Sequence, residues 1–344
     1  MIRLAVDAIN LLADRRGMGR FALSVLAQAL DRDDIALTLL VRRERAQTYR
    51  ELLASDRFAL ADLASAKRRD RYDVVWYPWN GVRFRSHAPA LVTIHDLFAF
   101  DYPARGFIGR RREQGPIRSA ARDATRIATN SWYTSERVVN FFTVDPARVL
   151  AIPHAPDRFF SPGYEDAPVE PPFVLAVGMG DKRKNAPFLI DSFARAFPER
   201  DVRLVIAGAL DPRAEKRAKR KRVPLVRVAP TDRELRTLYR TATAVAIPSL
   251  AEGFGLVAVE AQACGAAVIA ANTTALPEAV GDAGLLVDPT DRAAWASALR
   301  SVVRDEPLRS WLASKSEQRW GFSLREGAAR ATLDELARLA HDRA

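Results

Sequence analysis

In this 344-residue chain, the residues whose type and spacing most directly suggest chemistry are two glutamates eight positions apart, Glu252 and Glu260. A predicted strand runs towards Glu252, a Gly-Phe-Gly turn follows it, and a predicted helix carries Glu260. Eight helical residues cover about 12 Å, roughly the span from a sugar across a diphosphate to a ribose. Glu252 could therefore hold sugar hydroxyls and Glu260 ribose hydroxyls; the alternative is a chance pair of acids on one helix face. Backbone amides could receive phosphate at Gly253, Phe254, Gly255 and Leu256.

A basic loop with glycines is the second candidate anion site. Residues 178–185 read Gly-Met-Gly-Asp-Lys-Arg-Lys-Asn and follow directly on an apolar run that predicts a strand. The loop combines a flexible backbone with the cations Lys182, Arg183 and Lys184, and a helix is expected after it. These are the parts of a site for a dianionic or diphosphate group. A solvated basic loop is the simpler alternative.

The N-terminal half has a shorter glycine pattern after its first predicted strand. Gly17-Met-Gly19-Arg20 precedes a helix expected from about Phe21, so its backbone amides could approach an anion. Ala22 excludes the Gly-x-Gly-x-x-Gly dinucleotide pattern, and Arg20 in place of lysine excludes a P-loop. A tight turn is the simpler interpretation.

His95 is the candidate catalytic residue of the N-terminal half. It ends the fourth predicted strand, where a catalytic and a purely structural role are both open. Asp96 follows, although adjacent side chains of an extended chain point to opposite sides. Asn130-Ser131 takes the equivalent position after the next predicted strand.

Parallel strands are the elements expected to position these residues. Short apolar, β-branched runs alternate with longer amphipathic stretches, a pattern typical of parallel strands covered by helices on both faces. The expected strands are 2–6, 36–41, 74–77, 91–94, 126–129 and 149–152 in the first half, and 173–177, 204–207, 225–228, 244–247, 267–270 and 285–287 in the second. Two such sets predict two doubly wound α/β domains.

The two sets are separated by a proline-rich stretch. Residues 155–172 show little periodicity and are expected to link an N-terminal domain, residues 1–154, to a C-terminal domain, residues 173–344. Within 324–339, leucines recur at helical spacing and predict a helix that closes the second domain. Ligands of this architecture bind at the carboxyl ends of the strands, so we expect the site in a cleft between the domains.

Further segments accompany the glutamate pair in a recognisable order. They are Pro248-Ser-Leu-x-Glu252-Gly-Phe-Gly-Leu256, Glu260-Ala, Cys264-Gly265, Leu276-Pro-Glu278 and Gly281-Asp-Ala-Gly-Leu-Leu-Val-Asp-Pro289. Together they resemble the family 4 retaining glycosyltransferases, most densely over residues 173–290. The N-terminal half joins the resemblance through Gly17–Arg20, His95-Asp96, Ser131 and Ile152-Pro153. The resemblance implies the GT-B fold, two facing Rossmann-like domains with the site between them.

The resemblance also implies roles for single residues. Glu252 and Glu260 match the two donor-binding glutamates of the family, and Lys184 matches the lysine that contacts the donor diphosphate. Gly19 matches the loop glycine near the reacting sugar, and His95 matches the cleft histidine.

Three positions depart from the family pattern, and two of them, Val257 and Ala267, stand where proline is usual. Met179 stands where some members carry an arginine, so Lys182 or Arg183 is expected to supply that charge.

The implied activity is transfer of a hexose, with retained anomeric configuration, from a nucleoside-diphosphate sugar to a glycan or lipid-linked acceptor. The resemblance near Gly17–Arg20 is closest to mannosyltransferase-like members, which favours GDP-mannose as the donor. Charge that develops on the leaving diphosphate could be met by Lys184, its basic neighbours and the helix start at 253–256, without a metal or other cofactor. The only Asp-x-Asp, Asp31-Arg32-Asp33, precedes the second strand, away from the expected site.

Composition excludes several other classes. With 48% hydrophobic and 28% charged residues the chain is expected to be globular, and its single cysteine favours a reducing compartment. No uncharged apolar run approaches the ~18 residues of a membrane span, and the N-terminus lacks a signal-peptide pattern. We expect the protein in the cytoplasm, either free or peripheral on the inner face of the cell membrane.

The net charge of +11 allows a different class of function, a basic nucleic-acid-binding protein without transferase activity. Basic residues concentrate in 105–126 and 211–222. Single-strand binding calls for aromatic side chains among the cations, but 211–222 has none and 105–126 has only Phe107. We therefore expect no nucleic-acid partner. An anionic membrane surface, an acidic acceptor or a solvated helix face remain the interpretations of these runs.

Overall fold

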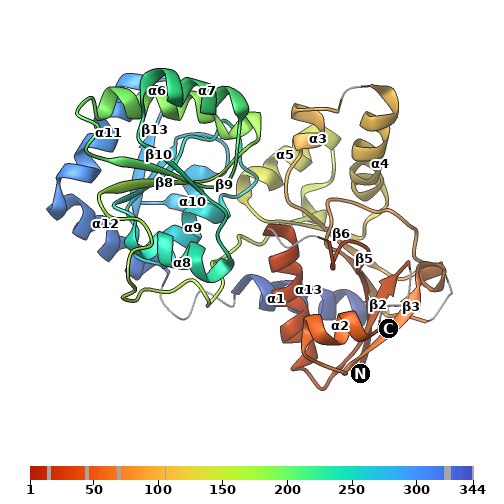
Figure 1. Cartoon of the computed structure of the whole chain (residues 1–344). Helices are drawn as coiled ribbons and strands as arrows, with labels where there is room; N and C mark the ends of the chain where they lie inside the picture. The colour runs from red at the N-terminus through yellow and green to blue at the C-terminus, as the bar shows by residue number, and fades with distance from the viewer. Residues whose placement is uncertain (14–16, 43–45, 68–70, 105, 321–326, 343–344) are drawn as a thin grey trace. The chain divides into compact units, whose positions relative to one another are not determined.

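The computed structural model describes residues 1–13, 17–42, 46–67, 71–104, 106–320 and 327–342. The chain forms two compact units, each with its own parallel sheet (Figure 1). Unit 1 comprises Met1–His154 and Glu326–Ala344, and unit 2 comprises Ala155–Arg325. The prediction of two doubly wound α/β domains is confirmed.

In the sheet of unit 1 the strand order is β3-β2-β1-β4-β5-β6-β7, and every recorded pairing is parallel. The strands are β1 (Ile2–Asp7), β2 (Ile35–Val41), β3 (Phe58–Asp62), β4 (Val74–Tyr77), β5 (Ala90–Ile94), β6 (Arg126–Thr129) and β7 (Val149–Ala151). β1 pairs with β2 on one side and β4 on the other, so the direction of winding reverses between β1 and β4. In a doubly wound sheet this reversal opens a binding position at the carboxyl ends of the two strands.

The edge strand β3 was not among the expected strands. Its sequence Phe-Ala-Leu-Ala-Asp alternates between partly buried and exposed positions, apart from buried Ala61. An edge strand is paired on one side only, so it lacks the continuous apolar run that identifies the central strands.

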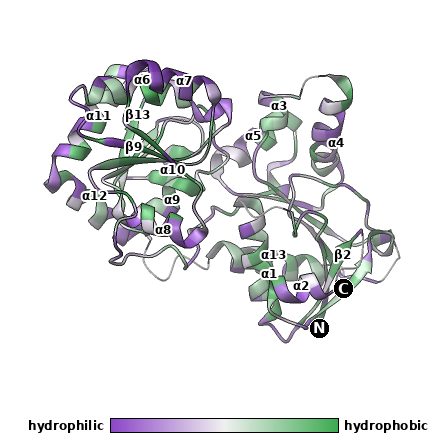
Figure 2. Cartoon of the chain, in the orientation of Figure 1, coloured by the Kyte–Doolittle hydropathy of each residue, from purple (hydrophilic) through white to green (hydrophobic). Residues whose placement is uncertain are grey.

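The helices of unit 1 lie along this sheet (Figure 1). They are α1 (Gly17–Leu30), α2 (Ala46–Leu53), α3 (Phe98–Asp101), α4 (Phe107–Asp123), α5 (Trp132–Phe142) and α13 (Gly327–His341), with short 3-10 turns η1 (Leu63–Lys67) and η2 (Pro146–Arg148). In Figure 2, α2 and α4 show hydrophilic stretches, whereas α1, whose only charged residue is Arg20, is largely hydrophobic.

The closing helix α13 belongs to unit 1, which corrects the expected domain 173–344. Leu333, Leu336 and Leu339 are buried in the core that also contains residues of β1, β2 and α1. α13 packs against α1 and the sheet of unit 1, so the apolar stripe of the helix covers that core. Residues 324–326 of the predicted helix lie outside the described residues.

Unit 2 has the strand order β10-β9-β8-β11-β12-β13, again with parallel pairings. Its strands are β8 (Phe173–Met179), β9 (Arg203–Leu210), β10 (Leu225–Val228), β11 (Ala244–Ile247), β12 (Val268–Ala271) and β13 (Gly284–Val287). Its helices are α6 (Ala186–Ala196), α7 (Pro212–Lys221), α8 (Asp232–Thr241), α9 (Leu256–Ala263), α10 (Leu276–Val280), α11 (Arg292–Arg304) and α12 (Glu306–Arg319), with the 3-10 turn η3 (Lys182–Lys184). Here the winding reverses between β8 and β11.

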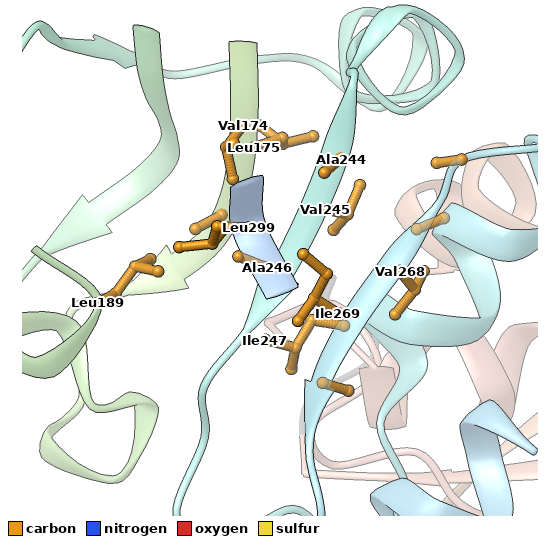
Figure 3. Close-up of a cluster of buried hydrophobic side chains, with 14 of the residues drawn as sticks. Val174, Leu175, Leu189, Ala244, Val245, Ala246, Ile247, Val268, Ile269 and Leu299 are labelled. Atoms are coloured by element: carbon orange, nitrogen blue, oxygen red, sulfur yellow. The ribbon is translucent and has the colours of Figure 1, made fainter. Parts of the chain in front are cut away.

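The central strands of unit 2 are buried on both faces. Every residue of β11 and β12 is buried, and Figure 3 shows Val245, Ile247 and Ile269 among the packed side chains. Leu189 of α6 and Leu299 of α11 belong to the same cluster. This two-sided burial explains why the strands could be read from continuous apolar runs.

The expected linker, residues 155–172, is not a free connection but part of unit 2. Phe160 is buried and packs against Tyr239 of α8 with ring centroids 5.8 Å apart. Glu165 forms an ion pair with Arg236, which is also on α8, at 2.9 Å. The hydrophobic periodicity of residues 155–172 is low because single side chains, and not the apolar face of a helix or strand, attach this stretch to unit 2.

Among the helices within the described ranges, none is both long and apolar enough to cross a membrane.

Candidate active site

The two strongest sequence motifs meet at the winding reversal of unit 2. The basic loop follows β8, the Glu252 segment follows β11, and these strands are neighbours with Val174 opposite Ala244. Parallel strands place their carboxyl ends at one edge of the sheet, which is the usual ligand position of this architecture. A backbone hydrogen bond joins the two segments directly, from the Leu250 N–H to the Arg183 carbonyl oxygen at 2.7 Å.

Glu252 lies between two cations of the basic loop. Its Oε1 accepts a hydrogen bond from Lys184 Nζ at 2.7 Å, and its Oε2 accepts one from Arg183 Nη1 at 3.0 Å. The carboxylate side chain is only 11% exposed. Both oxygens of a largely buried carboxylate are thus matched by positive charge, as burial of an ionised group requires.

Burial alone would raise the pKa of Glu252, but the charges of Lys184 and Arg183 outweigh it, so this pKa lies below its ordinary value of 4.5. Glu252 is therefore ionised at neutral pH and can only accept hydrogen bonds. An anionic acceptor of hydroxyl protons beside two cations is suited to a ligand that carries hydroxyls next to a phosphate.

Local backbone geometry fixes the two segments. Asp181 Oδ1 accepts a hydrogen bond from the Arg183 N–H at 3.0 Å and caps η3. The Glu252 N–H donates to Thr274 Oγ1 at 3.0 Å, which ties the segment to the stretch after β12. These hydrogen bonds attach the backbone of both segments beside Arg183 and Glu252.

The helix α9 begins at the turn after Glu252. Gly255 is its N-cap with a φ of 110°, and a Cβ built there would lie 2.8 Å from Leu276 Cδ2. Only glycine fits this backbone conformation and this close approach. The N-cap makes no side-chain hydrogen bond to the helix start. A phosphate at the amides of residues 253–256 stays a prediction from the sequence.

Glu260 lies on α9, buried near Tyr239 of α8. Its Oε2 accepts a hydrogen bond from the Tyr239 hydroxyl at 3.2 Å. Sequence reasoning had not singled out this tyrosine, because α8 contributes it from outside the motif.

The remaining residues of the basic loop are placed differently. Lys182 is exposed, and its charge acts on Asp211, whose pKa is lowered by a hydrogen bond from Arg213 and, more weakly, by Lys182. Met179 is buried with the apolar core of the unit. Of the two cations expected to replace an arginine at position 179, Arg183 is the one in contact with Glu252.

In unit 1 His95 follows β5 at the carboxyl edge of the sheet and is buried. Its Nε2 lies 2.9 Å from the Pro78 carbonyl oxygen, so Nε2 carries a proton. Its backbone N–H donates to Asn80 Oδ1 at 2.5 Å. Asp96 Oδ1 accepts a hydrogen bond from the Phe98 N–H at 3.1 Å.

Gly19 lies inside the first turn of α1 and is buried. The expected tight turn over Gly17–Arg20 with a helix from Phe21 is therefore wrong, because these residues already have helical backbone.

Two residues at the same edge were missed. Asp7 ends β1, where the winding reverses, and is completely buried. His154 follows β7 and stacks near His95 and Phe21, with ring centroids 5.5 and 4.1 Å away. Burial, with a smaller effect of His95, lowers the pKa of His154 well below 6.5, so its ring is neutral at pH 7. A search for polar residues directly after each predicted strand would have found Asp7, which follows the predicted strand 2–6. It would not have found His154, because Ile152 and Pro153 separate it from β7, a partly buried strand.

The chain is similar to known proteins in sequence and in fold. Residues 158–319 match the family model described as Glycosyl transferases group 1. A D-inositol 3-phosphate glycosyltransferase of Corynebacterium glutamicum (strain R) is 34% identical over 213 residues, covering 54% of this chain and 51% of that protein. One from Mycolicibacterium smegmatis is 33% identical over 254 residues, covering 65% and 56%. The chain thus spans little more than half the length of these relatives.

Solved structures share the fold over nearly the whole chain. Sucrose-phosphate synthase from Thermosynechococcus elongatus has a TM-score of 0.78 at 19% identity, with all of both chains covered. WaaG, a glycosyltransferase involved in lipopolysaccharide biosynthesis, has a TM-score of 0.76 at 14% identity, covering 98% of this chain and 99% of WaaG. Anabaena Alr3699/HepE in complex with UDP and glucose reaches 0.75 at 16% identity, covering 98% and 100%. At these identities the likeness concerns the fold, which matches GT-B glycosyltransferase structures.

Proposed function

We propose that the protein is a nucleotide-sugar-dependent glycosyltransferase that moves a hexose to a glycan or lipid-linked acceptor with retention of anomeric configuration. The observation that carries the proposal is the contact of Glu252 with Lys184 and Arg183 at the winding reversal of unit 2. It brings an acceptor of sugar hydroxyl protons and two phosphate-binding cations to one place. The match of residues 158–319 to the glycosyl transferases group 1 supports the same activity.

In this proposal the donor lies along the segment from Glu252 to Glu260. Glu252 holds hydroxyls of the transferred sugar, and Glu260 holds the ribose. Lys184, Arg183 and the amides at the start of α9 face the diphosphate. Negative charge grows on the diphosphate as the bond to the anomeric carbon breaks, and fixed cations and amides stabilise that transition state. Lys182, an exposed residue of the same loop, is in this proposal a further cation for the diphosphate.

We propose that transfer needs no divalent metal, since the cations of the loop neutralise the leaving group. Asp31-Arg32-Asp33, the one Asp-x-Asp of the chain, lies between α1 and β2, at the amino end of β2. Asp33 there pairs with Arg57 at 2.6 Å. Activity that persists in excess EDTA would support metal independence, and loss that Mg²⁺ or Mn²⁺ restores would contradict it.

The proposed donor and the proposed acceptors rest on different observations. GDP-mannose follows from the resemblance near Gly17–Arg20. The relatives named D-inositol 3-phosphate glycosyltransferase suggest a phosphorylated polyol as an acceptor to be tested beside glycans and lipid-linked sugars. We propose that His95 of unit 1 is a catalytic residue and that Gly19 of the same unit contributes to donor binding near the reacting sugar. None of the relatives described above is named as a nucleic-acid-binding protein, so no observation favours that alternative.

A thermal-shift screen against UDP-, GDP-, ADP- and dTDP-sugars tests the activity class. A ligand at about 100 times its dissociation constant adds about 2.7 kcal/mol of stability. We expect one nucleotide sugar to raise the Tm of the wild-type chain, and E252A to lose both that shift and turnover. Unchanged turnover in E252A would refute the role of Glu252.

A peripheral membrane location remains part of the proposal, and α4 supports it. Phe107 and Ile108 at the start of α4 are 75% and 83% exposed. Arg110, Arg111 and Arg112 follow and are also exposed. Apolar side chains that enter the headgroup region beside arginines are typical of an interfacial helix.

Co-sedimentation with vesicles tests this contact. We expect binding to phosphatidylcholine vesicles that contain phosphatidylglycerol and little binding to phosphatidylcholine alone. The double variant F107S/I108S should reduce binding without changing turnover of a soluble acceptor. Binding that ignores anionic lipid content would contradict the proposal.

A further inference from the structure

The second glutamate of the pair has a partner outside the sequence motif. Glu260 is buried, with 6% of its surface exposed, and its Oε2 accepts a hydrogen bond from the Tyr239 hydroxyl at 3.2 Å. Tyr239 is completely buried near the C-terminal end of α8, and α8 packs against α9, which carries Glu260. A buried tyrosine hydroxyl therefore reaches one oxygen of the carboxylate from a separate helix.

The residues before β8 hold Tyr239 in place. Phe160 is 1% exposed and packs edge-on against the Tyr239 ring, with centroids 5.8 Å apart. Glu165 pairs with Arg236 of the same helix at 2.9 Å, and Arg240 Nε donates to the Ser161 carbonyl oxygen at 2.7 Å. Since these contacts fix α8 to the segment 160–165, the direction of the tyrosine hydroxyl is set before any ligand binds.

We propose that Tyr239 is a positioning residue for the nucleotide ribose and acts through Glu260. The phenol occupies one lone pair of Oε2 and selects one rotamer of the glutamate. The carboxylate has about four lone-pair directions, of which this phenol takes one. Without the phenol, Glu260 must lose rotamer freedom when the nucleotide binds, which weakens binding. This inference rests on the proposed function and adds a residue to it.

Calorimetric binding of UDP, GDP and ADP, and of their 2′,3′-dideoxy counterparts, tests the role. Y239F keeps the ring and removes only the hydroxyl. We expect it to weaken binding of the ribose nucleotide that the wild-type chain prefers by about three- to tenfold, the effect of one hydrogen bond. The dideoxy nucleotide should bind Y239F and the wild-type chain equally, because it has no hydroxyls for Glu260. Y164F, at a tyrosine that is 94% exposed in the same unit, is the matched control and should bind like the wild-type chain.

A double-mutant cycle separates positioning from a general structural effect. E260A should weaken ribose binding, and adding Y239F to E260A should cause no further loss. An equal loss for ribose and dideoxy nucleotides in Y239F, or additive losses in the double variant, would overturn the inference. If Y239F fails to fold, F160L loosens the tyrosine ring and should reproduce the loss for the ribose nucleotide only.

The outcomes also separate this inference from the proposed function. If the wild-type chain binds a nucleotide and Y239F binds it with the same affinity, the role of Tyr239 is refuted and the proposed function stands. If none of the three nucleotides binds the wild-type chain, the proposed function fails, and the role of Tyr239 fails with it.

Discussion

Replacing Asp7 with asparagine should stabilise unit 1 at neutral pH and not at acid pH. Asp7 ends β1 and is completely buried. Its Oδ1 accepts a hydrogen bond from the Ile9 N–H at 3.0 Å, while its Oδ2 has no hydrogen-bond partner among the described residues. Burial raises the pKa of Asp7 from 3.8 to about 6, against smaller lowering effects of the Ile9 N–H and of Arg83 and Arg42.

The sign follows from the difference between the folded and the unfolded chain. Because the pKa of Asp7 is higher in the folded state, its contribution to stability is fully present below 3.8 and is lost as the pH rises through about 6. A difference of about 2 pKa units at about 1.4 kcal/mol each corresponds to about 3 kcal/mol at neutral pH. Asparagine does not ionise and escapes this loss. The free energy of unfolding of D7N, relative to that of the wild-type chain, should therefore rise by about 2 kcal/mol from pH 4 to pH 7. This is less than the full value of about 3 kcal/mol, because wild-type Asp7 has already lost part of its contribution at pH 4.

Urea unfolding at unit steps from pH 4 to pH 8 measures this gain. Tryptophan fluorescence is a suitable signal, because the Trp79 indole N–H donates to the Asp7 carbonyl oxygen at 2.6 Å. D62N is the control: Asp62 ends β3 of the same sheet, is exposed, and likewise accepts a hydrogen bond from a backbone N–H two residues on, at Ala64. A D7N advantage that is the same at pH 4 and pH 7 would refute the reasoning.

Three further substitutions test the site and the fold. K184A leaves the buried Glu252 without its closest cation, so it should lower the free energy of unfolding by about 1–3 kcal/mol and abolish the Tm shift caused by the preferred nucleotide sugar. G255A places a Cβ 2.8 Å from Leu276 Cδ2 at a φ of 110°, and urea unfolding should show a loss of more than about 1 kcal/mol. L336A should cost about 2–5 kcal/mol, and hydrogen exchange should locate the loss in unit 1.

Each of these variants has a control or a contradicting outcome. K216A removes an exposed lysine of α7 and should leave stability and the ligand shift unchanged. G115A lies inside α4, where a new Cβ meets nothing within 4 Å, so it should be neutral or stabilising by up to about 1 kcal/mol. For L336A, faster exchange in unit 2 with unit 1 unchanged would contradict the assignment of α13.

Much of the fold was predictable because its signal is local. β11 and β12 are buried at every position, so each appears in the sequence as an uninterrupted apolar run. The edge strand β3 alternates and was missed for that reason. The helical spacing of Leu333 and Leu336 predicted a helix near the C-terminus, but spacing records only which face is apolar. It contains no information on which core that face covers.

The sequence by itself determined the residue types and order of the candidate site: a basic loop after one strand, and Glu252 with Glu260 around a glycine turn after another. Tertiary structure decided the partners. Pairing of β8 with β11 brings Lys184 and Arg183 onto Glu252 across 68 and 69 residues of sequence, and packing of α8 on α9 brings Tyr239 to Glu260. Periodicity and turn chemistry act over a few residues and can be read along the chain. Ion pairs between distant segments depend on strand order and packing, which only the folded chain contains.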